Sequence, residues 1–151
     1  MNELLKKHKE SVCACETCQS YCARRPCWPT PEEADKILDA GFARRLMRDW
    51  WVDEPYVYII CPANEGCGGE DAPSWPSPSP CLLFKNGLCE LHGLGLKPFE
   101  GRAAHHDNDG STVHKDVADT WRTTKGKEVV ERWQRIIDAA VASQGDGDCT
   151  K

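Results

Sequence analysis

Large apolar residues and long apolar runs are scarce in this sequence. Only three Phe and two Met occur among its 151 residues, and the mean hydropathy is −0.60. Apolar runs such as residues 57–60 fall far short of the roughly 20 apolar residues that a membrane-spanning helix needs. No apolar region follows the charged first residues, as a secretory signal would require. We therefore expect one cytoplasmic domain without a membrane partner.

An excess of basic residues is also missing. The net charge is −5 and the pI is about 5.5, whereas a nucleic-acid-binding protein usually carries a basic face. Arg44, Arg45 and Arg48 could form a local patch, but an arginine run on one helix is more often a solvated face. Nucleic acid is therefore a disfavoured partner.

Cysteine, by contrast, is abundant, with ten residues. Thiols stay reduced in the cytoplasm, so a cysteine-dense chain there favours metal binding over disulfides. In an oxidising compartment the ten cysteines could instead form five bridges. Four thiolates close a tetrahedral site for zinc, our first choice, or for iron or an Fe–S cluster, our second. The eight candidate ligands are Cys15, Cys18, Cys22, Cys27, Cys61, Cys67, Cys81 and Cys89.

Eight ligands are enough for two tetrahedral sites. We expect metal binding to bring the first four cysteines, at 15–27, together with the second four, at 61–89. Cys13 and Cys149 are then left over. A single four-cysteine site is the alternative, because cysteine is often buried as a small apolar residue. The metal would be mainly structural, since a zinc site can contribute roughly 10–16 kcal/mol of apparent folding free energy.

The five histidines are weaker candidates. His92 could ligate or brace the site that contains Cys89, and His105 or His106 could supply a ligand or a catalytic base. We expect His8 and His114 to be surface residues on helices.

Several elements can be predicted before residue 61. Residues 2–12 suggest a short helix, or a frayed end. Thr30 and Glu33 form a capping box that begins a helix, and Gly41 ends it. Apolar residues at helical spacing predict a second helical segment over residues 42–50, and β-branched and aromatic residues predict a strand over 56–60 that delivers Cys61.

The second half is predicted to alternate loops with helices. Residues 62–80 hold five prolines, which exclude helix and central strand. Residues 81–92 predict a hairpin around an Asn-Gly turn, and residues 93–112 are loop-like. Helices follow over 113–121 and about 126–143, the second with a clear apolar stripe.

Several motifs resemble the YkgJ-like cysteine-cluster family. They are Cys15-x2-Cys18-x3-Cys22, the Thr-Pro-Glu-Glu sequence at 30–33, and the cysteine-bearing segments 81–84 and 87–92. The resemblance runs from about residue 15 to residue 106. It implies a zinc- or iron-chelating domain, a group sometimes labelled Fe–S oxidoreductases, and implies no established reaction.

Two departures from that family affect the ligand set. Its first motif is usually denser and ends in two adjacent cysteines. A later family cysteine is replaced here by Gly101. The resemblance therefore implies that one ligand is lost, or is replaced by His105, His106 or Cys67.

Together these features predict a small, loop-rich, metal-stabilised α+β domain covering residues 1–151. Its metal-binding core would span about 13–106, its C-terminal helices about 113–143, and its flexible tail 144–151. We favour a non-enzymatic, structural metal protein. One alternative is an iron, Fe–S or hydrolytic enzyme, although nucleophile-elbow, phosphate-loop and His-Glu-x-x-His motifs are missing. The other is an interaction module that uses residues 42–51 or the loop around Trp75.

Overall fold

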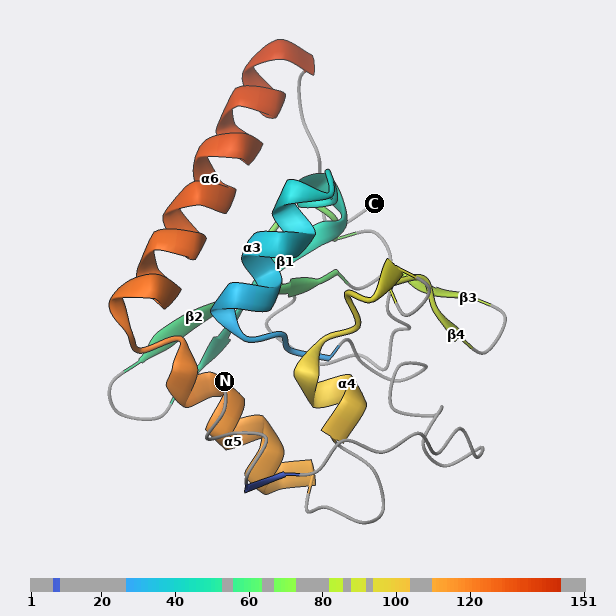
Figure 1. The fold of residues 1–151 in the computed structure, drawn as a ribbon. Helices are drawn as coiled ribbons and strands as arrows, with labels where there is room; N and C mark the ends of the chain where they lie inside the picture. The colour runs from blue at the N-terminus through green and yellow to red at the C-terminus, as the bar shows by residue number, and fades with distance from the viewer. Residues whose placement is uncertain are drawn as a thin grey trace.

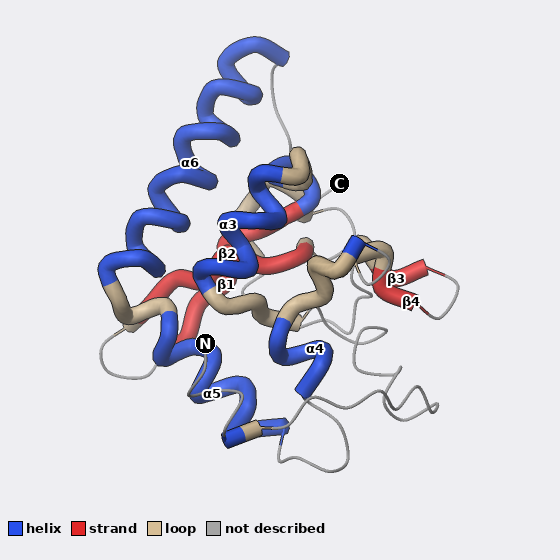
Figure 2. Tube along the Cα trace, in the orientation of Figure 1, coloured by secondary structure: helices blue, strands red, loops and turns tan. Residues whose placement is uncertain are grey.

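The computed structural model describes residues 7–8, 27–52, 56–63, 67–72, 82–85, 88–91, 94–103 and 110–144. Figure 1 shows α6 (Thr124–Gln144) along one side, beside α3 (Pro31–Asp39) and the pair β1 (Leu46–Trp51) and β2 (Val57–Pro62). A short α4 (Phe99–Ala103) lies near α5 (Gly110–Thr120). Figure 2 shows the same helices around the β1–β2 pair, with the small hairpin of β3 (Phe84–Lys85) and β4 (Leu88–Cys89) set apart. The α+β prediction is confirmed.

Helix α3 begins and ends where the sequence predicts. The Glu33 N–H donates to Thr30 Oγ1 at 3.3 Å, and the Thr30 N–H donates to Glu33 Oε1 at 2.9 Å. Gly41 lies just beyond the helix with φ of 89°, a conformation that glycine adopts without a steric penalty. The helix buries Ala34, Ile37 and Leu38.

The predicted helical segment over residues 42–50 is wrong. Only a 3-10 turn, η1 (Ala43–Arg45), forms there, and residues 46–51 are strand β1. Strand β1 pairs antiparallel with β2, from Leu46 opposite Pro62 to Trp51 opposite Val57. This pairing satisfies the backbone of both strands, and the aromatic end of β1 suits a pleated surface, so tertiary pairing overrides the helical spacing.

A third stretch of backbone lines the other edge of β1. The Arg48 N–H donates to Glu70 O at 3.1 Å, and the Ala72 N–H donates to Arg48 O at 2.9 Å. This contact ties down the described part of the predicted 62–80 loop. Close approach requires glycine at Gly68, where a Cβ atom would lie 2.3 Å from Arg44 O.

The remaining predicted elements that fall on described residues agree with the structure except at α4. Strands β3 and β4 pair with Lys85 opposite Leu88, which confirms the two-residue hairpin loop. Helices α5 and α6 confirm the two C-terminal helices within a few residues. Helix α4, by contrast, lies inside the predicted 93–112 loop. The predicted helix over 2–12 falls largely outside the described residues, as does the tail, and the domain subdivision stays a prediction.

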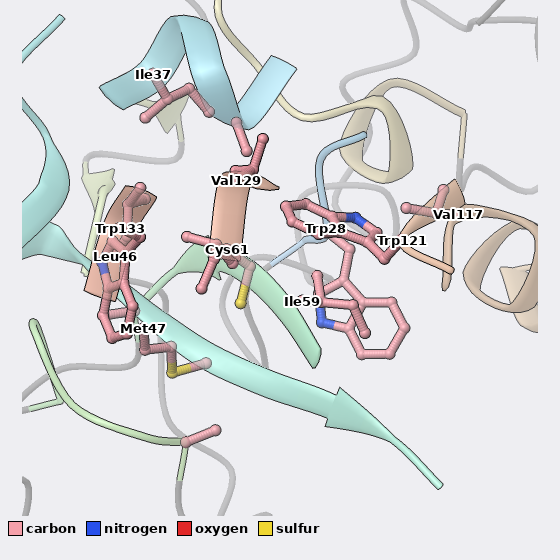
Figure 3. Close-up of a cluster of buried hydrophobic side chains, with 14 of the residues drawn as sticks. Trp28, Ile37, Leu46, Met47, Ile59, Cys61, Val117, Trp121, Val129 and Trp133 are labelled. Carbon is pink, nitrogen blue, oxygen red and sulfur yellow. The ribbon is translucent and has the colours of Figure 1, made fainter. Parts of the chain in front are cut away.

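Tryptophans supply much of the core that scarce Phe and Met leave unfilled. Figure 3 shows Trp121 and Trp133 among the buried side chains, and each is at most 1% exposed. Both indoles have hydrogen-bond partners, because Trp121 Nε1 donates to Pro29 O at 2.8 Å and Trp133 Nε1 donates to Ala43 O at 2.9 Å. Each tryptophan therefore joins α5 or α6 to the chain beside α3.

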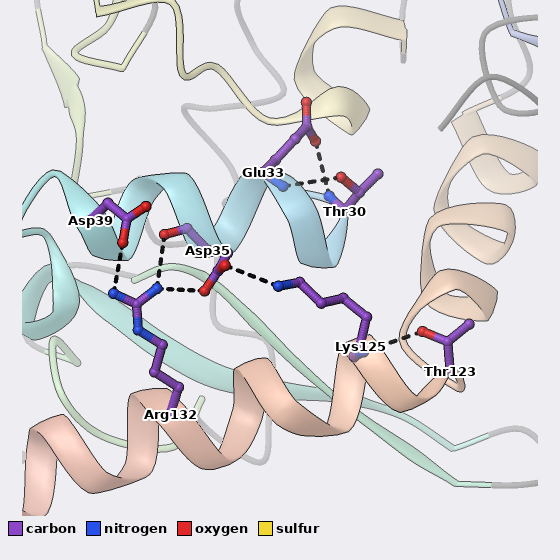
Figure 4. Close-up of polar contacts among 8 residues, drawn as sticks. Thr30, Glu33, Asp35, Asp39, Thr123, Lys125 and Arg132 are labelled. Atoms are coloured by element: carbon purple, nitrogen blue, oxygen red, sulfur yellow. Dashed lines mark hydrogen bonds and ion pairs between the residues drawn. The ribbon is translucent and has the colours of Figure 1, made fainter.

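An ion-pair network closes the contact between α3 and α6 (Figure 4). Lys125 Nζ lies 2.9 Å from Asp35 Oδ2. Arg132 contacts Asp35 and also donates to Asp39 Oδ1 at 2.8 Å.

Within the described ranges no helix has the length and apolarity to cross a bilayer.

Candidate functional site

The structure describes only some of the eight predicted cysteine ligands. Cys15, Cys18, Cys22 and Cys81 lie outside the described residues. The backbone of Cys89 belongs to β4. The other three predicted ligands are all buried: Cys27, Cys61 and Cys67 are 5%, 0% and 4% exposed.

Cys61 and Cys67 do not form a described metal site. Cys61 is a thiol within β2, in the cluster of buried apolar side chains that Figure 3 shows. Cys67 is disulfide-bonded, so in this form it offers no thiolate, contrary to the predicted reduced state. Across the described part of the chain, no group of three or more Cys, His, Asp or Glu side chains could hold a metal ion.

Trp28 fixes the position of the chain directly after Cys27. Its backbone N–H donates to Glu100 Oε1 at 3.0 Å, and the Glu100 N–H donates back to Trp28 O at 3.3 Å. The indole Nε1 donates to Asp49 Oδ2 at 2.9 Å. Trp28 is 2% exposed, so the end of the cysteine-rich segment is anchored in the core by packing and by three hydrogen bonds.

A buried carboxylate and an imidazole complete this anchor. Glu100 is 1% exposed and contacts His114 Nδ1. The His114 ring stacks on the Trp28 indole with centroids 3.6 Å apart, and the Trp51 ring meets it edge-on at 5.3 Å. A carboxylate on Nδ1 holds the proton on that nitrogen and sets the ring orientation. The prediction that His114 lies on the surface is wrong, because α4 brings Glu100 to it.

Glu33 positions α4 so that Glu100 can reach Trp28. Besides capping α3, its Oε1 accepts a hydrogen bond from the Phe99 N–H at 2.9 Å, and its other oxygen contacts Arg102. One carboxylate thus joins the start of α3 to the start of α4.

His8 forms a second anchor, on the other side of the cysteine-rich segment. It is 5% exposed, and its Nε2 lies 2.7 Å from Asp116 Oδ2, which Lys7 Nζ also approaches at 3.1 Å. Burial alone would raise the pKa of the Asp116 carboxyl, but hydrogen bonds from His8 and Lys7 outweigh it and lower that pKa. The prediction that His8 lies on the surface is therefore also wrong.

The two anchors meet on the same helix. His8 contacts Asp116 and Trp28 stacks on His114, and both partners belong to α5. The chain between the anchors, residues 9–26, carries four cysteines. Both ends of this cysteine-rich segment are thus held against α5 by contacts that do not involve cysteine.

The arginine patch considered as a nucleic-acid face is partly neutralised within the protein. Arg45 pairs with Glu90, and Arg48 Nε donates to Asp71 Oδ1 at 2.8 Å. These residues lie on η1 and β1 and not on the predicted helix.

Comparisons with known proteins do not identify the chain: no protein-family model, curated protein or solved structure matches it. The YkgJ-like resemblance therefore stays a prediction. His92, His105 and His106 lie outside the described residues, so their roles stay predictions too. Glu100 and Trp28 are not among the residues predicted from the sequence. The Arg-Pro-Cys-Trp sequence at 25–28 gave one signal for Trp28, since a large aromatic residue beside a cysteine cluster usually needs a core to bury it.

Proposed function

We propose that the cysteine-rich segment binds one structural metal ion through Cys15, Cys18, Cys22 and Cys27. Zinc is the first choice, because four thiolates from a closely spaced set suit its tetrahedral geometry. Iron is the second. A cytoplasmic location, where thiols stay reduced, is part of the proposal, because binding requires thiolates. The Cys67 disulfide runs against that location, and the thiol count described in the Discussion tests it.

The observation that carries this proposal is the pair of anchors on α5. His8 and Trp28 hold both ends of residues 9–26 against one helix. Ends that are both fixed on one helix reduce the chain entropy that the segment must lose when its thiolates converge on one ion. The segment contains few apolar residues, so metal coordination would replace the missing apolar burial.

The surroundings of Cys61 and Cys67 favour one metal site over two. Cys61 lies in the apolar core, where a small apolar role fits. Cys67 is in a disulfide. The two-site set that adds Cys61, Cys67, Cys81 and Cys89 is the alternative, and metal stoichiometry separates the two.

Matched cysteine variants test the site. We expect Cys18→Ser to lose bound metal and to melt at a lower temperature than the wild type. Cys149→Ser removes a cysteine that the proposal leaves unused, so it should keep full metal content and the wild-type melting temperature. Equal metal content in both variants would contradict the proposed ligand set.

An enzymatic role is the second candidate, and the His114–Glu100 pair favours it. A carboxylate that orients an imidazole is a common arrangement for a general base. The pair contacts Trp28, the residue that follows Cys27 in the sequence. Iron would supply redox chemistry in such a site. A charge-transfer band in protein purified without oxygen would support this candidate, and a colourless protein with stoichiometric zinc would argue against it.

A further inference from the structure

A cavity of about 310 Å³ opens between β2 and the turn that joins α5 to α6. Its size is at the low end of the range for small-molecule sites, roughly 300–1,000 Å³, and suits a single ring with a short side group. The residues of the two anchors do not line this cavity, so it is independent of the proposed metal segment.

Aromatic and aliphatic side chains form the inner surface. Trp121, which is fully buried, and Val57, which is 8% exposed, line it together with Val130. Tyr56 and Tyr58 form a wall, with their rings edge-to-face at 5.2 Å. Such rings favour another aromatic ring over an aliphatic one of similar size, because edge and face contacts are attractive beyond the area they bury.

Tyr56, just before β2, and Tyr58, within it, are 52% and 39% exposed. The Arg48 guanidinium already lies over the Tyr58 ring, 4.4 Å from its centroid, so Tyr56 is the more accessible of the two rings. Desolvation, with a further contribution from Tyr58, raises the pKa of the Tyr56 phenol. An ordinary tyrosine pKa of about 10 already keeps this phenol protonated at neutral pH, and part of the upward shift comes from its hydrogen bond with Tyr58.

The charged lining offers one cation to an anionic group of a ligand. Arg122 and Lys127 bring two cations to the cavity, and Glu131 brings one anion. Arg122 Nε already contacts Asp119 at 3.0 Å, whereas Lys127 makes no ion pair with any residue in the described ranges. The Lys127 ammonium is therefore the lining group placed to receive a carboxylate, and repulsion from Glu131 disfavours a group of higher negative charge still more than a monoanion.

We propose that this cavity binds a small aromatic monocarboxylate, with its ring against Tyr56 and Tyr58 and its carboxylate toward Lys127. The aromatic wall supplies the preference for a ring, and the Lys127 ammonium supplies the partner for a carboxylate.

Titration of the full chain with 4-hydroxyphenylacetate, followed by calorimetry and by amide chemical shifts, tests this inference. We expect saturable binding, with shifts at Tyr58 and Lys127. Two related compounds, cyclohexaneacetate without the aromatic ring and 4-hydroxyphenylacetamide without the charge, should each bind about tenfold more weakly, the scale of one lost charge-assisted or aromatic contact. Equal binding of either compound, or no binding of the acid, would overturn the proposal.

Three variants locate the binding. Lys127→Gln should weaken binding about tenfold. Val130→Phe should block it by filling the cavity while the charges stay in place. Lys115→Gln makes the same charge change at an exposed α5 residue that does not line the cavity, and it should bind like the wild type. If the ligand binds Lys127→Gln and Val130→Phe as tightly as wild type, it binds elsewhere and the inference is wrong.

Discussion

The His114 ring stacks on the Trp28 indole at a centroid separation of 3.6 Å and an interplanar angle of 24°. This contact joins the end of the cysteine-rich segment to α5. Glu100 supports both partners, because it accepts the Trp28 N–H and contacts His114. The three residues come from three separate parts of the sequence, and their contacts place the segment relative to the folded core.

Removal of the Glu100 side chain should therefore lower the free energy of unfolding. Glu100→Ala leaves the buried Trp28 N–H without its acceptor and His114 without its carboxylate, so we expect a loss of about 3 kcal/mol in unfolding free energy. Denaturant unfolding measures this loss. Glu128→Ala removes the same side chain from an exposed position on α6, and should change stability by less than about 0.5 kcal/mol. Equal losses in the two variants would contradict the anchoring role.

The Asp35 network predicts a specific dependence of stability on pH. A hydrogen bond from Lys125 is the largest influence on Asp35; together with Arg132 it lowers the pKa of that carboxyl, although burial opposes the shift. A lowered pKa adds stability above the ordinary carboxyl value, about 3.9, and this contribution is lost as the pH falls through the lowered pKa.

Asp35→Asn should accordingly be about 1 kcal/mol less stable than wild type at pH 7, and the difference should disappear on acidification below about pH 3. Urea unfolding at a series of pH values provides the measurement. Asp138→Asn, an equal charge change at an exposed α6 position, serves as the control. A difference between wild type and Asp35→Asn that grows as the pH falls would have the wrong sign.

Gly68 should tolerate no side chain. A Cβ atom there would lie 2.3 Å from the Arg44 carbonyl oxygen, and relief requires movement of the backbone beside β1. We expect Gly68→Ala to lower the unfolding free energy by about 2 kcal/mol. Gly41→Ala meets no neighbouring atom and carries only the conformational cost of its positive φ, about 1 kcal/mol. Thermal unfolding compares the two, and an unchanged melting temperature for Gly68→Ala would refute the close approach.

The Cys67 disulfide can be tested by counting thiols. In protein denatured with chelator and without reductant, alkylation followed by mass spectrometry should label at most eight of the ten cysteines. Cys67→Ser releases the partner thiol, so the number of labelled cysteines should rise by one although one cysteine has been removed. A fall by one would mean that Cys67 is reduced in the purified protein, as the sequence analysis expected.

Short sequence patterns correctly predicted the helices whose ends and buried faces are set by residues close together in the chain. The capping box at Thr30 and Glu33, the stop at Gly41 and the apolar stripe of α6 each act within a few residues. Strand β1 could not be predicted this way, because its state depends on pairing with β2, and its apolar spacing fitted a helix equally well.

The anchors were missed for a related reason. Glu100, His114 and Trp28 are far apart in the sequence, and α4 is too short to show a helical pattern. His8 and His114 have no distinctive neighbours in the sequence. Only their tertiary partners, Asp116 and Glu100, reveal that His8 is buried and that His114 is half-buried.

The measurement that tests the metal proposal most directly is elemental analysis of protein purified without oxygen, combined with melting in the presence of a strong chelator. The account predicts one zinc per chain, no visible colour and a lower melting temperature in chelator, because the metal contributes to folding. A folded protein that contains no metal and melts at the same temperature with and without chelator would contradict it.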